Sequence, residues 1–304
     1  MILFGENVHS SRSKDFRPSY GRLSELRAFV PEGTPFMACT ATATLSVRSD
    51  ITTSLEFTDD YQVIAHSPDR PNIFYEVKRR DDIATDLEPL LSTLRDKGVA
   101  APRTIVYCPS IKMCSHLYAH FHFELGAASY HPLGSTELAQ NRLFAMFHSC
   151  TSQRSKDVVF QSFLDLDGVV RVVFATNALG MGVDFRGLCN IIHYGAPRSM
   201  DDYFQESGRG GRGGEDCKSV IFWKPADCPM KQQPTTQHEM EVNEMRMYVE
   251  NSTECRRKIL LQHFDPMNAK SGASKAKCCD VCAAAVVSNI TYYRAIFLLT
   301  WAVQ

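Results

Sequence analysis

The hydrophobic pattern in the middle of the chain predicts strands that alternate with helices. Residues 104–108 form a short apolar run typical of a buried strand, and residues 111–125 repeat apolar side chains with helical spacing. The apolar residues on one face of that helix are Met113, Leu117, Phe121 and Leu125. A strand followed by such a helix is the building unit of a parallel sheet.

The same alternation continues toward the C-terminus. Strands are predicted at 169–176, 190–194 and 218–223. A helix at 200–207 begins with two aspartates, which are favoured in a first helical turn. This β-α-β series covers roughly 120 residues, about the size of one doubly wound lobe. We therefore expect an α/β fold built on a parallel sheet.

The segments that flank this lobe differ from it in pattern. A strand at 35–40 leads into a helix after Thr44, whereas the two prolines of 67–71 indicate a connector. A helical run at 239–264 precedes a polar loop at 265–277. The predicted units are the remnant of a preceding domain, the lobe, a helical subdomain and an apolar tail, at 1–66, 67–225, 226–285 and 286–304.

Composition places the chain among ordinary globular proteins. It has 304 residues, 44% hydrophobic and 22% charged, which excludes collagen-like, low-complexity and wholly disordered classes. The net charge of −1 gives no global argument for a nucleic-acid partner, so such a partner must be argued locally. Residues 1–10 lack a secretory signal, and the apolar stretch 296–303 is shorter than the roughly 20 residues that cross a bilayer. We expect neither export nor a membrane partner, and most of the 11 cysteines to be reduced thiols.

The strongest chemical signal is a glycine-rich segment at 205–214 that carries Arg209 and Arg212. Two arginines three residues apart can face one anionic ligand, and glycine lets the backbone approach it, which suits a phosphate. The alternative is a flexible Arg-Gly-Gly segment that binds RNA loosely, but its position between a predicted helix and a predicted strand argues against disorder. We expect both guanidinium groups to face the carboxyl edge of the sheet, where ligands of such sheets bind.

A second polar turn ends the strand at 169–176. It carries Gly180 and Gly182 and the carboxylate of Asp184. Ligands of open α/β sheets bind at the carboxyl ends of strands, where this turn is expected to lie.

These segments resemble the conserved motifs of one helicase family. Residues 175–184, Ala-Thr-Asn-Ala-Leu-Gly-Met-Gly-Val-Asp, are similar to motif V of the RecQ family in helicase superfamily 2. Residues 205–212, Gln-Glu-Ser-Gly-Arg-Gly-Gly-Arg, are similar to motif VI. The likeness extends from Asp15 to Cys282. It includes the stretch after the aromatic-rich loop, motif III, the junction into the second lobe and motif IV, at 15–20, 38–43, 69–72 and 104–110.

The resemblance implies an ATP-dependent DNA helicase that moves 3′ to 5′ and closes two RecA-like lobes around ATP and Mg²⁺. This chain would contain the end of the first lobe, the whole second lobe and a small helical zinc-binding subdomain. Arg212 would be an arginine finger on the γ-phosphate, and Arg209 and Gln205 would support it and link it to DNA. Gly182 and Asp184 would bind the nucleotide together with the two arginines, with Asp184 contacting the ribose or, alternatively, ordering the motif V loop.

The resemblance also implies contacts with single-stranded DNA and duplex junctions. Thr176 would face the DNA backbone, and Arg17 would add a further DNA contact. Thr40 and Thr42 would couple the two lobes or, alternatively, cap a helix. The family and the reduced thiols together suggest nuclear residence.

Four cysteines crowd toward the C-terminus: Cys255, Cys278, Cys279 and Cys282. The two-residue spacing between Cys279 and Cys282 lets both thiolates reach one tetrahedral metal, and the family closes a four-cysteine Zn²⁺ site in this place. Adjacent cysteines seldom share a zinc ion without strain, so the site is completed by Cys278, by His263 or by neither. The competing interpretation is a group of ordinary thiols.

The region around these cysteines is locally basic. Between 252 and 282 six basic residues stand against three acidic ones, a net charge of +3. Arg256 and Arg257 are therefore candidates for contacts with DNA phosphates, although most charge runs are merely solvated faces.

Two elements of a helicase motor are missing. The chain contains no Gly-Lys and no Asp-Glu dipeptide, so it lacks the usual phosphate loop and Mg²⁺-binding box. We expect a C-terminal portion of a helicase that is inert as an ATPase alone. Gly210 and Gly213 replace the family's usual Ala and Asp, which predicts a looser motif VI loop. The alternative function is a non-catalytic platform that binds DNA or a partner protein.

Overall fold

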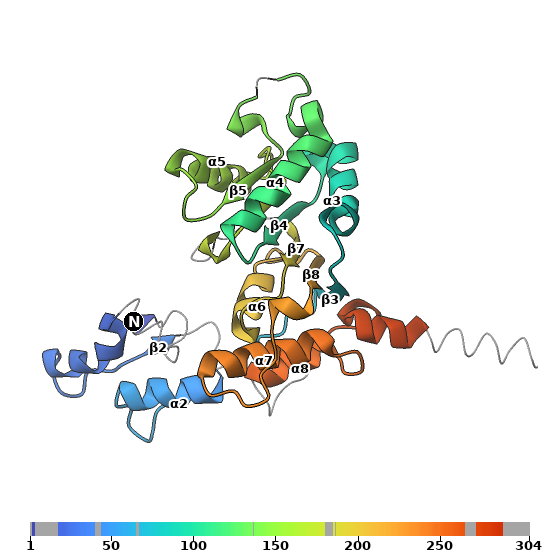
Figure 1. Cartoon of the computed structure of the whole chain (residues 1–304). Helices are drawn as coiled ribbons and strands as arrows, with labels where there is room; N and C mark the ends of the chain where they lie inside the picture. The colour runs from blue at the N-terminus through green and yellow to red at the C-terminus, as the bar shows by residue number, and fades with distance from the viewer. Residues whose placement is uncertain are drawn as a thin grey trace, which may run out of the picture.

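The computed structural model describes residues 2–3, 18–39, 44–64, 67–135, 137–179, 185, 187–264 and 272–287. At its centre is a six-stranded, wholly parallel sheet with the order β3-β8-β7-β4-β6-β5 (Figure 1). The strands are β3 (Ile73–Arg79), β4 (Arg103–Tyr107), β5 (Phe144–Phe147), β6 (Val172–Ala175), β7 (Leu188–Tyr194) and β8 (Cys217–Trp223). The predicted α/β fold with a parallel sheet is confirmed.

Helices cover both faces of the sheet, as an α/β lobe requires. The helices α3 (Ile83–Lys97) and α4 (Ile111–Leu125) pack on one face. On the other face lie α5 (Gln153–Leu164) and α6 (Met200–Ser207). Each helix connects two parallel strands, so it must run back from the carboxyl edge of the sheet toward the amino edge.

Local capping explains why these helices begin where they do. Ser110, Ser152 and Ser199 each accept a hydrogen bond from the backbone N–H three residues further on, at the starts of α4, α5 and α6. The observed bounds of α4 and α6 coincide with the predicted 111–125 and 200–207. The apolar face predicted for α4 is also correct, except that Cys114 is fully buried and Met113 is only half-buried.

Two hydrophobic cores hold the layers together. On the α3 and α4 side, Leu91, Leu117 and Phe121 pack against Phe174 and other sheet residues. On the α5 and α6 side the core is larger, because it continues from the sheet through α6 into the C-terminal helices. This continuity joins the lobe and the C-terminal subdomain through one shared core.

The C-terminal subdomain contains α7 (Gln237–Glu250), α8 (Arg256–Phe264) and α9 (Lys275–Cys278), followed by a helical turn at 280–287. The prediction of one helical run from 239 to 264 is wrong, because the helix breaks after Glu250. The side-chain oxygen of Asn251 accepts the N–H groups of Thr253 and Glu254, a local turn that competes with helical hydrogen bonds. The loop predicted at 265–277 lies partly outside the described residues, and α9 occupies its end.

The N-terminal segments form a separate small cluster beside the lobe (Figure 1). It contains β1 (Ile2–Leu3), η1 (Pro18–Phe29), β2 (Ala38–Cys39) and α2 (Leu45–Ser54), with Leu55 completely buried. The predicted helix after Thr44 is confirmed, since Thr44 caps α2. Short 3-10 turns complete the chain: η2 (Gly98–Ala100), η3 (Gly126–Ser129), η4 (Ala139–Asn141), η5 (Asn177–Leu179) and η6 (Pro225–Asp227).

Among the described residues, no helix is both long enough and apolar enough to cross a bilayer. The apolar stretch 296–303 lies outside those residues.

Candidate functional site

The arginine-bearing loop joins the end of α6 to the start of β8. Gln205 lies in the last turn of α6, Arg209 follows it with only 7% of its surface exposed, and Arg212 is exposed. Arg212, predicted to contact the γ-phosphate, and the two residues predicted to support it thus lie on one short segment. Hydrogen bonding holds the loop into a defined turn, because the Gly210 N–H donates to Ser207 and the Gly214 N–H donates to Gly211.

The backbone of this loop lies at the amino edge of the sheet, and the predicted direction of its two guanidinium groups, toward the carboxyl edge, stays a prediction. The Gly211 N–H donates to the carbonyl of Leu188, the first residue of β7, at 2.9 Å. Because α6 runs antiparallel to the strands, its C-terminal loop is carried to the amino edge. An arginine that acts on a nucleotide held by another domain needs exposure rather than the carboxyl edge of its own sheet, and Arg212 is exposed.

A buried polar cluster lies under the end of α6. Nε2 of His193 lies 2.8 Å from Oε2 of Glu206, and the ring of His193 stacks on Tyr107 with a centroid distance of 5.2 Å. Burial and the negative charge of Glu206 raise the pKa of Tyr107, while the positive charges of Arg209 and Arg212 oppose the rise. The charges of both arginines are thus felt inside this cluster.

Close packing requires glycine at two positions of the loop, Gly210 and Gly211, which contradicts the looser loop predicted from Gly210; Gly213 meets only the side chain of Glu215. A Cβ atom on Gly210 would lie 2.1 Å from Sγ of Cys217. Gly211 has a φ of +59°, and a Cβ there would lie 2.4 Å from the side-chain nitrogen of Asn72. The backbone therefore presses directly against β8 and the segment before β3.

The carboxyl edge carries a different set of groups. Thr176 follows β6 there, beside a cavity of about 760 Å³ that is also lined by Ser110, His193, Arg198 and Lys231. The predicted position of Thr176 at a strand end is confirmed. Six candidate residues named from the sequence lie outside the described residues: Arg17, Thr40, Thr42, Gly180, Gly182 and Asp184.

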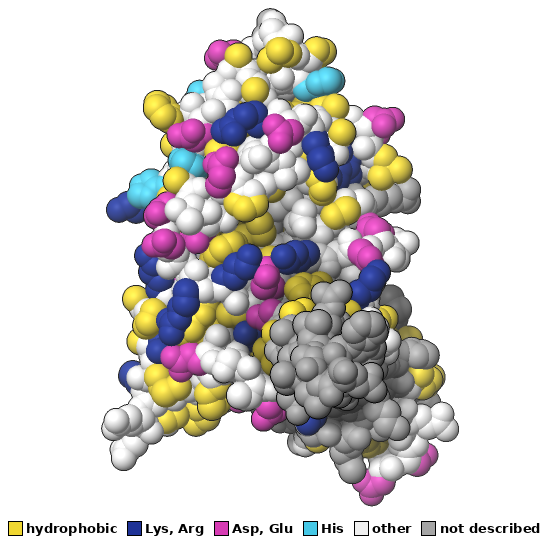
Figure 2. Space-filling model, turned by 90° about the vertical axis from the view of Figure 1, so that its right-hand side faces the viewer, with side chains coloured by type: hydrophobic (Ala, Val, Ile, Leu, Met, Phe, Trp, Pro, Cys, Tyr) yellow, Lys and Arg dark blue, Asp and Glu magenta, His cyan; other side chains and the backbone are white. Residues whose placement is uncertain are grey.

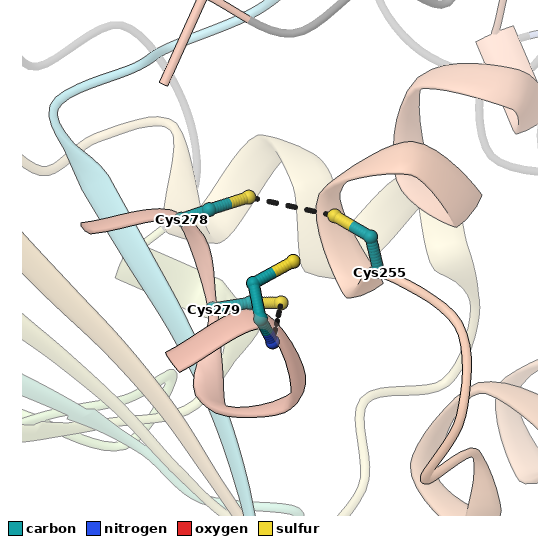
Figure 3. Close-up of side chains that lie close together, drawn as sticks. Cys255, Cys278 and Cys279 are labelled. Carbon is teal, nitrogen blue, oxygen red and sulfur yellow. Dashed lines mark hydrogen bonds between the residues drawn. The ribbon is translucent and has the colours of Figure 1, made fainter. Parts of the chain in front are cut away.

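The four C-terminal cysteines converge on one point. Their sulfur atoms all lie within 4.8 Å of one another, and the sulfurs of Cys255 and Cys278 are 3.4 Å apart (Figure 3). Four thiolates around a tetrahedral zinc ion, with Zn–S bonds of about 2.3 Å, have sulfurs about 3.8 Å apart. The arrangement fits Zn²⁺.

The adjacency of Cys278 and Cys279 does not prevent both from reaching this point. Cys278 is the last residue of α9, whereas the backbone of Cys279 is extended and pairs with Tyr75 of β3 in a parallel β-bridge. The chain therefore bends between the two side chains. The Cys282 N–H points to Sγ of Cys279 at 3.5 Å. A hydrogen bond with Cys255 and burial raise the pKa of Cys279 to about 12, which favours the neutral thiol unless a cation is bound.

His263 belongs to a different contact. Its Nε2 lies 3.0 Å from Oδ2 of Asp201, and its Nδ1 lies 3.7 Å from Glu244. Of the three ways left open for completing the zinc site, the geometry therefore favours Cys278.

Arg256 and Arg257 do not form a DNA-binding surface, which contradicts the prediction made for them. Arg256 is 4% exposed and pairs with Asp280 at 2.6 Å, and Arg257 is 1% exposed and pairs with Asp69 at 2.7 Å. A guanidinium group that is buried and paired cannot reach a phosphate. Where described residues are visible in Figure 2, Lys and Arg side chains are interspersed with Asp and Glu.

No local pattern in the sequence marks the buried partners of the loop. Glu206 and His193 are 13 residues apart and come from different elements, and Tyr107 comes from a third. Arg70 and Asn72, which contact the loop, were noticed only because 69–72 resembles a family junction. Their distance from the loop along the chain, 139 residues for Asn72 and Gly211, hides the contact.

Comparison with known proteins yields two family matches. Residues 86–214 match the helicase conserved C-terminal domain, and residues 212–283 match the RecQ zinc-binding family. The second match contains all four converging cysteines.

Curated relatives match most of this chain. Over 283 residues it is 32% identical to the bifunctional 3′-5′ exonuclease/ATP-dependent helicase WRN of Mus musculus, covering 88% of this chain and 19% of that protein. It is 30% identical to the ATP-dependent DNA helicase RecQ of Haemophilus influenzae over 277 residues, covering 88% of this chain and 40% of that protein. The chain thus spans well under half the length of either relative.

A solved structure supports the fold. The structure of S. cerevisiae Dbp5 bound to RNA and ADP BeF3 superposes with a TM-score of 0.52 at 15% sequence identity, covering 79% of this chain and 55% of that one. At this identity the likeness concerns the RecA-like fold alone.

Proposed function

The chain belongs to the RecQ family of helicases, as a C-terminal portion with a RecA-like lobe and a RecQ zinc-binding region. On this premise we propose that it supplies the catalytic arginine of an ATP-dependent 3′-5′ DNA helicase. The observation that carries the proposal is the exposed Arg212 on a tightly packed loop. An exposed guanidinium group on an ordered loop can reach a nucleotide that a different lobe holds.

The chemistry of this arginine is electrostatic. Charge develops on the γ-phosphoryl oxygens during phosphoryl transfer, and a positioned guanidinium group stabilises that charge. The phosphate loop and the Mg²⁺-binding carboxylates would come from a first lobe in the full-length protein. Arg209, which is almost fully buried, would help to hold the loop that carries Arg212 and would not contact the nucleotide.

DNA would bind at the carboxyl edge of the sheet. The helices α4 and α5 begin at this edge, and their first turns carry the exposed Lys112 and Arg154. Arg198, also exposed, lies in the loop before α6 and lines the same cavity as Thr176. Helix N-termini and basic side chains both favour phosphate oxygens, so this edge replaces Arg256 and Arg257 as the proposed DNA surface.

Zinc would have a structural role. The four cysteines would hold Zn²⁺ as a closed site without an open coordination position, which stabilises a fold instead of activating water. We keep the units 67–225 and 226–285 as the proposed lobe and subdomain. Nuclear residence stays a prediction.

The test is steady-state ATP turnover by the full-length protein that contains this chain, with and without single-stranded DNA. We expect Arg212→Ala to lower kcat by about 10³-fold or more, in keeping with the loss of an arginine finger. The matched control is Arg95→Gln, because Arg95 lies on the outer face of α3 and pairs only loosely with Glu88 at 3.6 Å. The 304-residue chain alone should show no turnover.

An unchanged kcat in Arg212→Ala would refute the catalytic role. If the full-length protein bound DNA but showed no turnover at all, the non-catalytic platform would become the better description.

A further inference from the structure

The connector before β3 reaches across the amino edge of the sheet to the arginine-bearing loop. Arg70 donates from Nη1 to the carbonyl of Gly208 at 3.2 Å. Its Nη2 donates to the carbonyls of Gly210 and Gly211 at 3.0 and 2.8 Å. The side chain of Arg70 therefore donates hydrogen bonds to three carbonyls of the loop.

Asn72 continues this contact two residues later. Its side-chain nitrogen donates to the carbonyls of Gly211 and Glu215, both at 2.8 Å, and its own carbonyl accepts the N–H of Cys217 at 2.9 Å. Together Arg70 and Asn72 bind the loop on both sides of Arg212. The backbone that carries Arg212 is thereby held at four of its carbonyls.

The C-terminal subdomain in turn holds the connector. Nη1 of Arg257 on α8 donates to Oδ1 of Asp69 at 2.7 Å and to the carbonyl of Arg70 at 2.6 Å. Its Nη2 donates to the carbonyl of Ile73 and, at 3.5 Å, to that of Cys278. The side chain of Asp69 is 8% exposed and that of Arg257 is 1% exposed, so this pair is shielded from water.

These contacts form one continuous path from a metal-site cysteine to the loop. Arginine is suited to the central position because its planar fork presents several donors in fixed directions, whereas a lysine ammonium cannot satisfy three carbonyls in the same geometry. The loop carbonyls point toward Arg70, so the loop conformation depends on the position of the connector.

We propose that Arg70 is a positioning residue for Arg212, and that the connector 69–72, held by Arg257, sets the conformation of the arginine-bearing loop. This inference rests on the proposed function only where it concerns catalysis. The physical claim is that loss of the Arg70 fork releases the backbone at 208–214.

The structural part of the proposal is tested on the 304-residue chain by hydrogen–deuterium exchange. We expect Arg70→Gln and Arg70→Lys to increase exchange at the amides of 208–214 by about 10-fold or more, while β7 and α4 stay protected. Arg95→Gln is the matched control and should change neither region. The zinc content and the circular dichroism spectrum of each variant show whether it is folded. If Arg70→Gln does not fold, Arg70→Lys, which keeps the positive charge, provides the test alone.

The catalytic part is tested in the full-length protein. We expect Arg70→Lys to lower kcat for ATP about 100-fold, since a misplacement of about 1 Å can cost that much, with little change in KM. In the Arg212→Ala background the same substitution should cost nothing further, because the group it positions is gone. A merely structural defect would lower kcat by the same factor in both backgrounds.

The two proposals fail in different ways. Unchanged exchange at 208–214 in a folded Arg70 variant would overturn the positioning role whatever the kinetics. If exchange at 208–214 increased in the Arg70 variants but Arg212→Ala left kcat unchanged, the structural role of Arg70 would stand and the catalytic role of the loop would be refuted. Additive losses of kcat in the double variant would overturn the claim that Arg70 acts through Arg212.

Discussion

Gly210→Ala tests how tightly the arginine-bearing loop packs on the sheet. A methyl group at this position would lie 2.1 Å from Sγ of Cys217 and 3.4 Å from Cγ1 of Ile191. Gly210 and Cys217 are both buried, and the loop backbone is held by Arg70 from the other side. Neither the loop nor β8 can move freely, so the added methyl group must displace the cysteine side chain or the backbone.

The magnitude follows from two opposing effects. Overpacking a buried site costs about 1–3 kcal/mol, whereas replacing glycine by alanine stabilises by about 0.4–1 kcal/mol through the unfolded chain. We expect a net loss of about 1–2 kcal/mol in the free energy of unfolding. For a domain of this size that corresponds to a fall in Tm of roughly 3–6 °C.

The assay is urea and thermal unfolding, monitored by circular dichroism, of Gly210→Ala, Cys217→Ala and the double variant. Removing Sγ clears the obstructing atom, so the double variant should be about 1–2 kcal/mol more stable than the sum of the single effects predicts. Gly213→Ala is the matched control, because its new methyl group meets only the mobile carboxylate of Glu215. We expect that control to change stability by less than about 0.5 kcal/mol.

Strict additivity between Gly210→Ala and Cys217→Ala would refute the packing argument. So would a Gly210→Ala variant as stable as the parent chain. Either result would restore the interpretation that glycine at this position merely loosens the loop.

Further outcomes are expected from other parts of the molecule. Metal analysis by inductively coupled plasma mass spectrometry should find about one zinc per chain, lost in Cys278→Ser and in Cys279→Ser but kept in Cys228→Ser; zinc retained in Cys278→Ser would remove that residue from the site. Burial alone would lower the pKa of His263, but its hydrogen bond to Asp201 and the charges of Asp201, Glu244 and Glu241 outweigh burial and raise it. The stability from this contact is therefore complete below the ordinary pKa of 6.5 and is lost as the pH rises through the raised value, so His263→Gln should flatten the dependence of the free energy of unfolding on pH in that window. Arg198→Gln should reduce the slope of log affinity against log salt concentration by about 1 for single-stranded DNA, measured by fluorescence anisotropy. Arg256→Gln should lower Tm without changing that slope, and a reduced slope in Arg256→Gln would reinstate it as a DNA contact.

Local features of the sequence predicted the strands β4, β6, β7 and β8 and the helices α4 and α6, but not the strands β3 and β5 or the helices α3 and α5. The starts of α4 and α6 follow from serine caps, and their apolar faces follow from spacing along a single helix. The cysteine spacing and the glycine-rich segment likewise marked the two places where chemistry was expected. All of these signals act over a few residues, so they are readable without the fold.

The interior position of Arg256 and Arg257 was decided by tertiary structure. In sequence they belong to a basic run, and such a run predicts a solvated or DNA-binding face. Their partners, Asp280 and Asp69, lie 24 and 188 residues away. Whether a charged side chain can reach a ligand depends on whether distant residues pair with it and bury it. Counting charges along the sequence contains no information about such partners.

The edge of the sheet to which Arg212 belongs was likewise settled only in three dimensions. The order of helix, loop and strand was predicted correctly, but the direction in which α6 returns across the sheet places the loop beside Leu188, Asn72 and Cys217. Contacts between residues more than 100 positions apart depend on chain topology, whereas caps and periodicity depend on neighbours. For that reason the residues that hold the arginine-bearing loop are identified only in the folded molecule, whereas the glycines and arginines of the loop itself are recognised in the sequence.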